Sequence, residues 1–240
     1  MPRNTESNQK PRASRSTRKT VKDTDLKSVQ LKPSQHDYHN KILKNEITFC
    51  SGPAGTSKTF TACYSALHLL ATKQIKSVIL CKPIQESGEK LGFLPGDIAD
   101  KIDPFMQSYI SNFKKMIGHE LTEALISAGV LEFKPLAYMR GDTFDDALMI
   151  LDEAQNATFK QLMLFVTRMG KKSKVIVTGD ISQYDIPKNN IGLPGFINLM
   201  EGIRGIGHHK FTDQDIVRAK ILKDVVAKYD KWRVDHDPVK

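Results

Sequence analysis

The sequence lacks the features that mark a membrane or secreted protein. No run of apolar residues approaches the roughly 18 that cross a bilayer, and the first residues include no apolar segment suited to secretion. Its three cysteines, Cys50, Cys63 and Cys81, lie in apolar segments without the spacing of a metal site. The sequence therefore predicts a cytoplasmic protein that has no membrane partner and whose cysteines are reduced and buried.

Aromatic residues are also scarce. They make up 8% of the 240 residues and form no cluster on which single-stranded bases would stack. Hydrophobic residues nevertheless reach 40%, which is enough for a sizeable core. The length and composition together indicate one catalytic domain with a tail.

Negative charge is nearly absent from the N-terminal segment. Residues 1–32 contain nine Lys or Arg and three acids, a net of +6 in a chain of net charge +9. This segment is rich in Ser, Thr and Pro, and it has too few large apolar groups to fold alone. We predict a disordered basic arm over residues 1–32 and a folded domain over residues 33–240. The charge of the arm suits phosphate backbones, although a solubilising tail explains it equally well.

Beyond the arm, β-branched apolar runs alternate with helical patterns. We expect strands over residues 47–51, 77–82, 130–134, 148–152, 174–178 and 207–211, and helices over residues 59–72, 98–116, 119–128, 158–169, 195–203 and 213–230. Such alternation predicts an α/β fold with a mostly parallel sheet and helices on both faces. A ligand site would lie at the carboxyl ends of the strands.

A phosphate-binding loop follows the first expected strand. The stretch Ser51–Phe60, which reads SGPAGTSKTF, comes directly after an apolar run and precedes a helical pattern. In such loops backbone N–H groups cradle a polyphosphate, and the helix adds its positive N-terminal end. The residues expected to contact the nucleotide are Gly52, Pro53, Ala54, Gly55, Thr56, Ser57, Lys58 and Thr59. On its own, the pattern also fits an ordinary strand–turn–helix with an exposed lysine.

Three positions in this loop have distinct expected roles. Lys58 would reach the β- and γ-phosphates, and the hydroxyl of Thr59 is the expected protein ligand of Mg²⁺. Ser57 stands where the usual pattern has glycine, so we expect it to hold a backbone conformation that glycine adopts more easily. Strain of this kind costs about 1 to 3 kcal/mol.

Two later strands are expected to end in polar groups that complete the site. The run Leu148–Glu153 ends in Asp152, which would hold Mg²⁺ through its water shell, and Glu153, which would orient or deprotonate the attacking water. The run Lys174–Gln183 ends in Asp180 and Gln183, which would lie near the γ-phosphate if the two strands are neighbours. Each run alone would be read as a strand that enters a turn.

These segments together resemble the PhoH-like family of ATPases, which is related to the first motor domain of superfamily 1 helicases. The resemblance covers about residues 35–229. It depends on the phosphate loop and on GEKLGFLPGD (88–97), LAYMRG (136–141), LDEAQN (151–156) and TGD (178–180). The chain departs from the family pattern at Ser57 and at Lys82, where arginine usually precedes the proline. A RecA-like P-loop NTPase fold is implied.

The resemblance also implies roles for single residues. Gln35 is similar to the glutamine that reads the adenine edge, and Lys82-Pro83 is similar to a segment that faces single-stranded nucleic acid. Arg218 matches an arginine that approaches the γ-phosphate in its own subunit or a neighbour. Arg140 and Arg204 are further candidates for that contact, and a solvated ion pair explains any of these arginines at least as well.

The function that follows is Mg²⁺-dependent ATP binding and hydrolysis coupled to single-stranded RNA or DNA. Helicase-type movement normally needs two such domains, so we expect a homo-oligomer, of which a hexameric ring is one form. The alternative is an ATP-gated nucleic-acid-binding protein in which Ser57 makes hydrolysis negligible. A small-molecule kinase is less well supported, because the sequence shows no second substrate pocket or arginine-rich lid.

Overall fold

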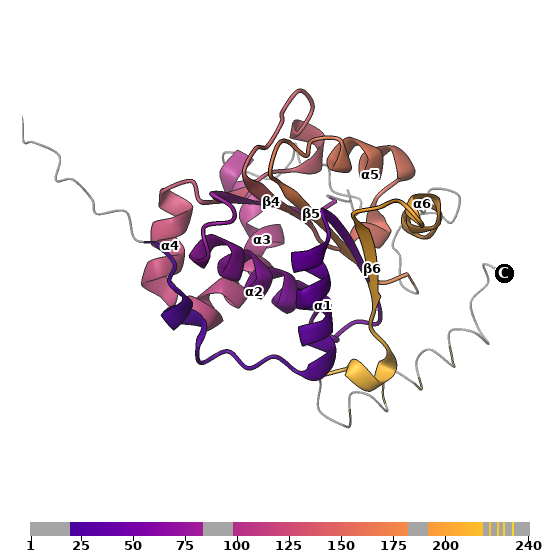
Figure 1. The fold of residues 1–240 in the computed structure, drawn as a ribbon, viewed down its shortest axis with the longest axis horizontal. Helices are drawn as coiled ribbons and strands as arrows, with labels where there is room; N and C mark the ends of the chain where they lie inside the picture. The colour runs from indigo at the N-terminus through magenta and orange to yellow at the C-terminus, as the bar shows by residue number, and fades with distance from the viewer. Residues whose placement is uncertain are drawn as a thin grey trace, which may run out of the picture.

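The computed structural model describes residues 20–83, 98–181 and 192–217, together with Ile221, Val225, Lys228 and Trp232. Within these residues, six strands form one sheet in the order β3-β2-β4-β5-β1-β6, and every pair of neighbours is parallel. Helices cover both faces of this sheet (Figure 1). The α/β fold expected from the sequence is confirmed.

The strands are short and mostly buried. They are β1 (Ile47–Ser51), β2 (Ser77–Cys81), β3 (Leu131–Phe133), β4 (Ala147–Leu151), β5 (Lys174–Gly179) and β6 (Ile206–Lys210). All six fall where the sequence predicts them. In the interior strands nearly every residue is buried, as expected when a parallel sheet is covered on both sides.

The helices divide into two layers. They are α1 (Pro33–Lys44), α2 (Lys58–Ala71), α3 (Ile98–Ile117), α4 (His119–Ser127), α5 (Phe159–Val166) and α6 (Leu193–Met200). Side chains of α1 to α4 pack in one hydrophobic cluster, and those of α5 and α6 pack in a second cluster across the sheet (Figure 1). Consecutive strand residues such as Phe49 and Cys50 point into opposite clusters, as the pleat requires.

Helix α1 is not predicted from the sequence. Its buried side chains are Gln35, Tyr38, His39 and Ile42, which have the spacing of one helical face. Two of the four are polar, so a search for apolar periodicity overlooks the helix. The predicted helix over residues 213–230 lies mostly outside the described residues. Those that are described show a 3-10 turn over Asp213–Asp215 and helical Ile221, Val225 and Lys228.

The folded body begins earlier than residue 33. Val21 and Leu26 are buried in the core cluster, and a 3-10 turn over Asp23–Leu26 contacts α2 and α3. Residues 20–32, which the sequence analysis assigns to the basic arm, therefore pack against the domain. Residues 1–19 lie outside the described residues.

The described residues include all three cysteines and the helices α1 to α6. Cys50, Cys63 and Cys81 are all buried free thiols, and burial raises the pKa of each one. A raised pKa keeps a thiol protonated and unreactive. Among the helices of the described segments, none is long and apolar enough to cross a membrane.

Candidate functional site

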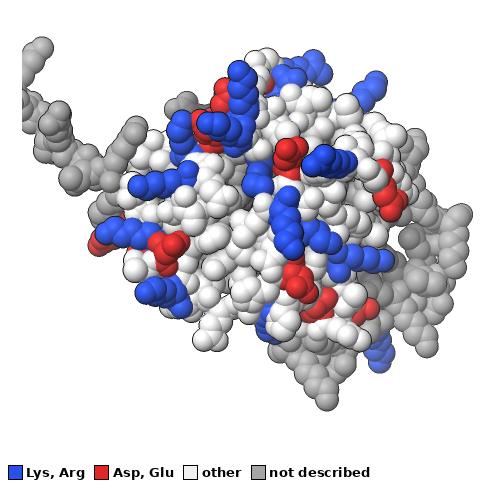
Figure 2. All heavy atoms as spheres, viewed as in Figure 1, with Lys and Arg blue, Asp and Glu red and all other residues white. Residues whose placement is uncertain are grey.

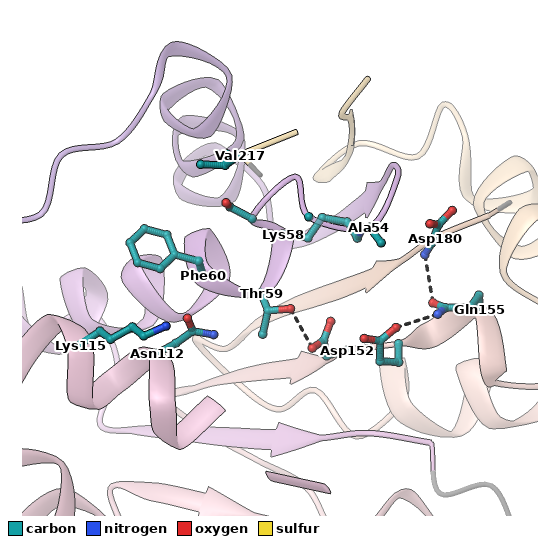
Figure 3. Close-up of a pocket in the computed structure, with 13 residues that line it drawn as sticks. Ala54, Lys58, Thr59, Phe60, Asn112, Lys115, Asp152, Gln155, Asp180 and Val217 are labelled. Carbon is teal, nitrogen blue, oxygen red and sulfur yellow. Dashed lines mark hydrogen bonds between the residues drawn. The ribbon is translucent and has the colours of Figure 1, made fainter. Parts of the chain in front are cut away.

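A cavity of about 610 Å³ opens at the carboxyl edge of the sheet, beside the start of α2. Its walls come from the loop after β1, the ends of β4 and β5, and one face of α3 (Figure 3). The lining residues are Ala54, Gly55, Ser57, Lys58, Thr59, Phe60, Asn112, Lys115, Asp152, Glu153, Gln155, Asp180 and Val217. The expected phosphate loop and both expected acidic strand ends thus meet at one cavity.

The backbone of the loop has the conformation that the sequence predicts. Ser57 lies in the left-handed region, with φ 68° and ψ 29°, immediately before the first residue of α2. Glycine adopts this region without the steric cost that a side chain adds. Gly52 has φ 150°, and a Cβ there would lie 2.7 Å from the Cβ of Phe211. Close packing of the residue after β6 therefore requires glycine at position 52.

Lys58 lies across the loop. Its ammonium donates to the carbonyl oxygens of Gly52 at 2.7 Å and Pro53 at 2.9 Å. The Thr56 hydroxyl also donates to Pro53, at 2.9 Å. A phosphate in the loop would offer the ammonium a charged acceptor in place of two neutral ones, and charge-assisted bonds are the stronger kind.

Thr59 and Asp152 approach each other from two elements. The Thr59 hydroxyl on α2 donates to Oδ2 of Asp152 at 2.8 Å (Figure 3). Thr178 near the end of β5 donates to Oδ1 of the same carboxylate. Asp152 is 2% exposed, so its carboxylate is held in place from both sides. A hydroxyl and a carboxylate oxygen at this distance fit a hard divalent cation such as Mg²⁺, which binds oxygen ligands. These two residues would hold the ion, as the sequence predicts.

Glu153 and Asp180 are connected through Gln155. The side-chain amide of Gln155 donates to Oε2 of Glu153 at 2.7 Å, and its oxygen accepts the backbone N–H of Asp180 at 3.0 Å. Glu153 itself has a left-handed backbone, with φ 55° and ψ 36°, and its side chain is exposed at the cavity. The sequence predicts site roles for Glu153 and Asp180 but not the bridging role of Gln155, although Gln155 lies within the LDEAQN motif (151–156).

The cavity wall that lies opposite Gln155 and Asp180 is not predicted from the sequence. Figure 3 shows Phe60, Asn112 and Lys115 on one side of Thr59, with Gln155 and Asp180 on the other. Phe60 follows the loop directly, so its place could have been inferred. Asn112 and Lys115 belong to α3, and no local signal in that helix points to a ligand.

The segment after β6 is attached to the phosphate loop. The Val217 N–H donates to the carbonyl of Gly55 at 2.9 Å. Asp215, just before it, accepts from the backbone and hydroxyl of Thr212 at 2.7 and 3.0 Å. These hydrogen bonds lower the pKa of Asp215 although partial burial, the largest influence, opposes them. The segment that leads from β6 to Val217 is thus in direct contact with the loop.

The remaining predicted residues lie in different places. Gln35 is 5% exposed, and its side-chain oxygen accepts the Lys32 N–H at 2.8 Å, which caps α1. It is not among the residues that line the cavity, and neither are the exposed Arg140 and Arg204. Gln183 and Arg218 lie outside the described residues. The roles of these five residues stay predictions.

Lys82 follows β2 at the same edge of the sheet. Its ammonium donates to the Ser108 hydroxyl on α3 at 2.7 Å and lies 3.7 Å from Oδ2 of Asp152. It also lies 5.3 Å from the centre of the Tyr109 ring. Burial, with a smaller contribution from Asp152, raises the pKa of Tyr109, so its hydroxyl stays a neutral donor to the Cys81 carbonyl at 2.9 Å.

The parallel sheet, with the loop after β1 and the two acidic strand ends at one edge, has the RecA-like P-loop NTPase fold. A solved structure of similar fold is the large terminase from the thermophilic bacteriophage D6E. It has a TM-score of 0.51 and 11% sequence identity, and the match covers 82% of this chain and 50% of the terminase chain.

The chain belongs to the PhoH-like protein family, whose model matches residues 29–230. A PhoH-like protein of Bacillus subtilis (strain 168) is 43% identical over 85% of this chain and 65% of its own length. A PhoH-like protein of Mycobacterium tuberculosis (strain ATCC 25618 / H37Rv) is 44% identical over 83% of this chain and 57% of its own length. Protein PhoH of Escherichia coli (strain K12) is 35% identical over 82% of this chain and 56% of its own length. The chain therefore spans about 56 to 65% of these relatives.

Proposed function

We propose that this protein binds ATP with Mg²⁺ and hydrolyses it, and that the cycle is coupled to single-stranded RNA or DNA. The observation that carries the proposal is the meeting of Lys58, the Thr59–Asp152 pair and Glu153 at one cavity. A phosphate-binding lysine, oxygen ligands for a divalent cation and an exposed carboxylate are the groups that phosphoryl transfer to water requires.

Each group has a separate task in this reaction. Lys58 and the backbone of the loop neutralise charge on the β- and γ-phosphate oxygens. Thr59 and Asp152 would hold Mg²⁺, which supplies further charge compensation when bound. Glu153 orients the attacking water or takes its proton, and Gln155 limits the freedom of its carboxylate through the 2.7 Å hydrogen bond.

Asp180 and Gln155 support the coupling step. Asp180 is 4% exposed at the end of β5, and its N–H is bonded to the same amide that holds Glu153. A change at the γ-phosphate would reach both residues, since one amide side chain contacts both. Gln183 is proposed to act with them, and Arg218 is proposed to approach the same phosphate.

The polynucleotide is proposed to bind along the carboxyl edge of the sheet. Figure 2 shows that on the face covered by α1, α2 and α4 the Lys and Arg side chains lie in small groups with Asp and Glu among them. Interspersed charge is a poor surface for a phosphate backbone, which needs a row of cations. Lys82 lies at the carboxyl edge and is 13% exposed, beside the cavity.

The first experiment is to measure phosphate release from Mg²⁺-ATP with and without single-stranded RNA and DNA. Lys58→Ala removes the cation that faces the phosphates, so we expect loss of tight ATP binding and of turnover. Glu153→Gln keeps the hydrogen-bonding shape and removes the base. We expect nearly normal ATP binding with turnover reduced about 100-fold or more, as for loss of a general base.

Two outcomes would contradict parts of this proposal. Full hydrolysis by the Glu153→Gln protein would remove Glu153 from its proposed role. ATP binding without phosphate release by the wild type, with either polymer present, would favour the ATP-gated binding protein. In that case Ser57, whose side chain lines the cavity, is the residue to replace with glycine.

A homo-oligomer is part of the proposal, with a hexameric ring as one form. If an arginine of a neighbouring subunit completes the site, the activity per subunit will fall when the protein is diluted to monomer. Activity that stays constant over that dilution would assign hydrolysis to the single subunit.

A further inference from the structure

Lys82 and the metal-ligand candidate Asp152 form a mostly buried ion pair. The Lys82 side chain is 13% exposed and that of Asp152 is 4% exposed. A buried ammonium is costly unless a charge or several hydrogen-bond acceptors compensate it. Of the described residues, Asp152 makes the ion pair with Lys82, and Ser108 and the Tyr109 ring supply its neutral contacts.

The Oδ2 atom of Asp152 is shared between two partners. It accepts the Thr59 hydroxyl at 2.8 Å and lies 3.7 Å from the Lys82 ammonium. The same oxygen belongs to the pair that fits a divalent cation. A cation held by Thr59 and Asp152 would therefore face the positive charge of Lys82 across one carboxylate, and two cations near one anion repel each other.

The Lys82 ammonium lies beside α3, along which a phosphate would be a second partner for it. Ser108 lies on α3, and Asn112 and Lys115 follow it at the i+4 and i+7 positions of the same helical face. Both of these later residues line the cavity. A phosphate placed beside this face would meet Lys82, the Ser108 hydroxyl and Lys115, and would replace Asp152 as the partner of Lys82.

We propose that Lys82 couples the metal site to polynucleotide binding. With no metal its ammonium pairs with Asp152, and with a single-stranded phosphodiester bound beside α3 it pairs with that phosphate and releases Asp152 to the metal. The metal–nucleotide complex and the polynucleotide then favour each other's binding, by the reciprocity of linked equilibria. Lys82 is a positioning residue in this scheme, and the inference rests on the proposed nucleotide and polynucleotide binding.

The test measures binding rather than turnover. A fluorescent, non-hydrolysable ATP analogue is titrated with Mg²⁺ or with EDTA, in the presence or absence of oligo(U) or oligo(dT). In the wild type we expect one of the oligonucleotides to strengthen Mg²⁺-dependent binding about fivefold or more. That oligonucleotide identifies the polymer. With EDTA the enhancement should be absent.

Lys82→Met removes the charge and keeps most of the chain length. We expect it to bind the Mg²⁺–analogue complex about as tightly as the wild type does with the oligonucleotide, and to gain nothing further when the oligonucleotide is added. Lys82→Arg keeps the charge and should keep the enhancement. Lys76→Met is the matched control, because Lys76 precedes β2, the strand that Lys82 follows, and pairs there with Asp146.

The results separate failure of this inference from failure of the proposed function. An enhancement that survives Lys82→Met, or that is missing in a wild type which binds both ligands, would overturn the coupling role. If Lys82→Met weakens binding of the ATP analogue equally with Mg²⁺ and with EDTA, the coupling role is also overturned, because Lys82 would then contact the phosphates of the nucleotide directly. A wild type that binds the analogue no better than Lys58→Ala would instead refute nucleotide binding. Thermal unfolding of each variant checks the fold, and Lys82→Arg still tests the coupling if Lys82→Met unfolds.

Discussion

The two ends of the β2–β4 strand pair have the same residue types in different surroundings. The strands pair in register from Ser77 and Ala147 to Cys81 and Leu151, and a lysine and an aspartate flank them at each end. At the amino end, Nζ of Lys76 lies 2.7 Å from Oδ2 of Asp146, and the two side chains are 79% and 29% exposed. At the carboxyl end, Nζ of Lys82 lies 3.7 Å from Oδ2 of Asp152, and the two side chains are 13% and 4% exposed.

The exposed Lys76–Asp146 pair has the shorter distance, yet it is expected to contribute less than the buried Lys82–Asp152 pair. An exposed pair gains little, because water and salt screen its charges. In the buried pair, the Asp152 carboxylate also accepts from the hydroxyls of Thr59 and Thr178, and the Lys82 ammonium also donates to Ser108. Burial and shared partners therefore distinguish the carboxylate proposed to hold the metal from a surface one, whereas the ion-pair distance does not.

The largest contrast is expected from replacing the two aspartates. Asp152→Asn removes one carboxylate oxygen from the proposed metal site, so binding of a Mg²⁺–ATP analogue should weaken about 10- to 100-fold. Binding of the metal-free analogue should change little. Asp146→Asn is the matched control and should leave both affinities unchanged. The measurement is analogue binding with Mg²⁺ and with EDTA, and equal effects of the two substitutions would remove the distinction between the strand ends.

A smaller contrast concerns two residues with left-handed backbone. Ser57 has φ 68° in the phosphate loop, and Lys73 has φ 57° after α2 at the amino edge. Glycine relieves strain at either position but is more flexible in the unfolded chain, so each substitution should raise the free energy of unfolding by at most about 1 kcal/mol. Only Ser57→Gly should change phosphate release. Denaturant unfolding and ATPase assays on both variants test this, and a similar change of turnover in Lys73→Gly would contradict it.

The smallest effect is expected at the exposed pair. The hydrogen bond from Lys76 lowers the pKa of Asp146, so the pair stabilises the protein above the ordinary pKa of aspartate. That stability is lost as the pH falls through the lowered pKa of Asp146. Lys76→Met should therefore cause a small decrease in Tm at neutral pH, and this decrease should vanish in acid and shrink in high salt. A decrease that persists in acid would mean that Lys76 stabilises the fold by packing.

Local sequence was enough to predict the strands and the core of the site. The apolar runs before Ser51 and Asp152 are long enough to specify buried strands, and the glycines and Lys58 have fixed spacing within one loop. The left-handed backbone of Ser57 also follows from its place in that spacing. These features depend on residues that are neighbours in the chain.

Features that depend on distant residues were missed. The helix α1 was overlooked because Gln35 and His39 occupy two of its buried positions. His39 is neutral in this setting, since burial, with smaller contributions from two nearby histidines, lowers its pKa to about 4. The packing of Val21 and Leu26 could not be separated from a disordered arm by composition, because their partners lie on α2 and α3.

By itself, the sequence determined the phosphate loop, the acidic strand ends, and the succession along the chain of the six strands and of helices α2 to α6. These follow from local backbone preferences and from the burial of apolar runs. The tertiary structure decided which groups share a partner. The Gln155 amide contacts the Glu153 carboxylate and the Asp180 N–H, and the Asp152 carboxylate contacts both Thr59 and Lys82. The physical reason is that hydrogen bonds and ion pairs act over a few ångströms, and only the fold brings the ends of β2, β4 and β5 and the start of α2 within that range.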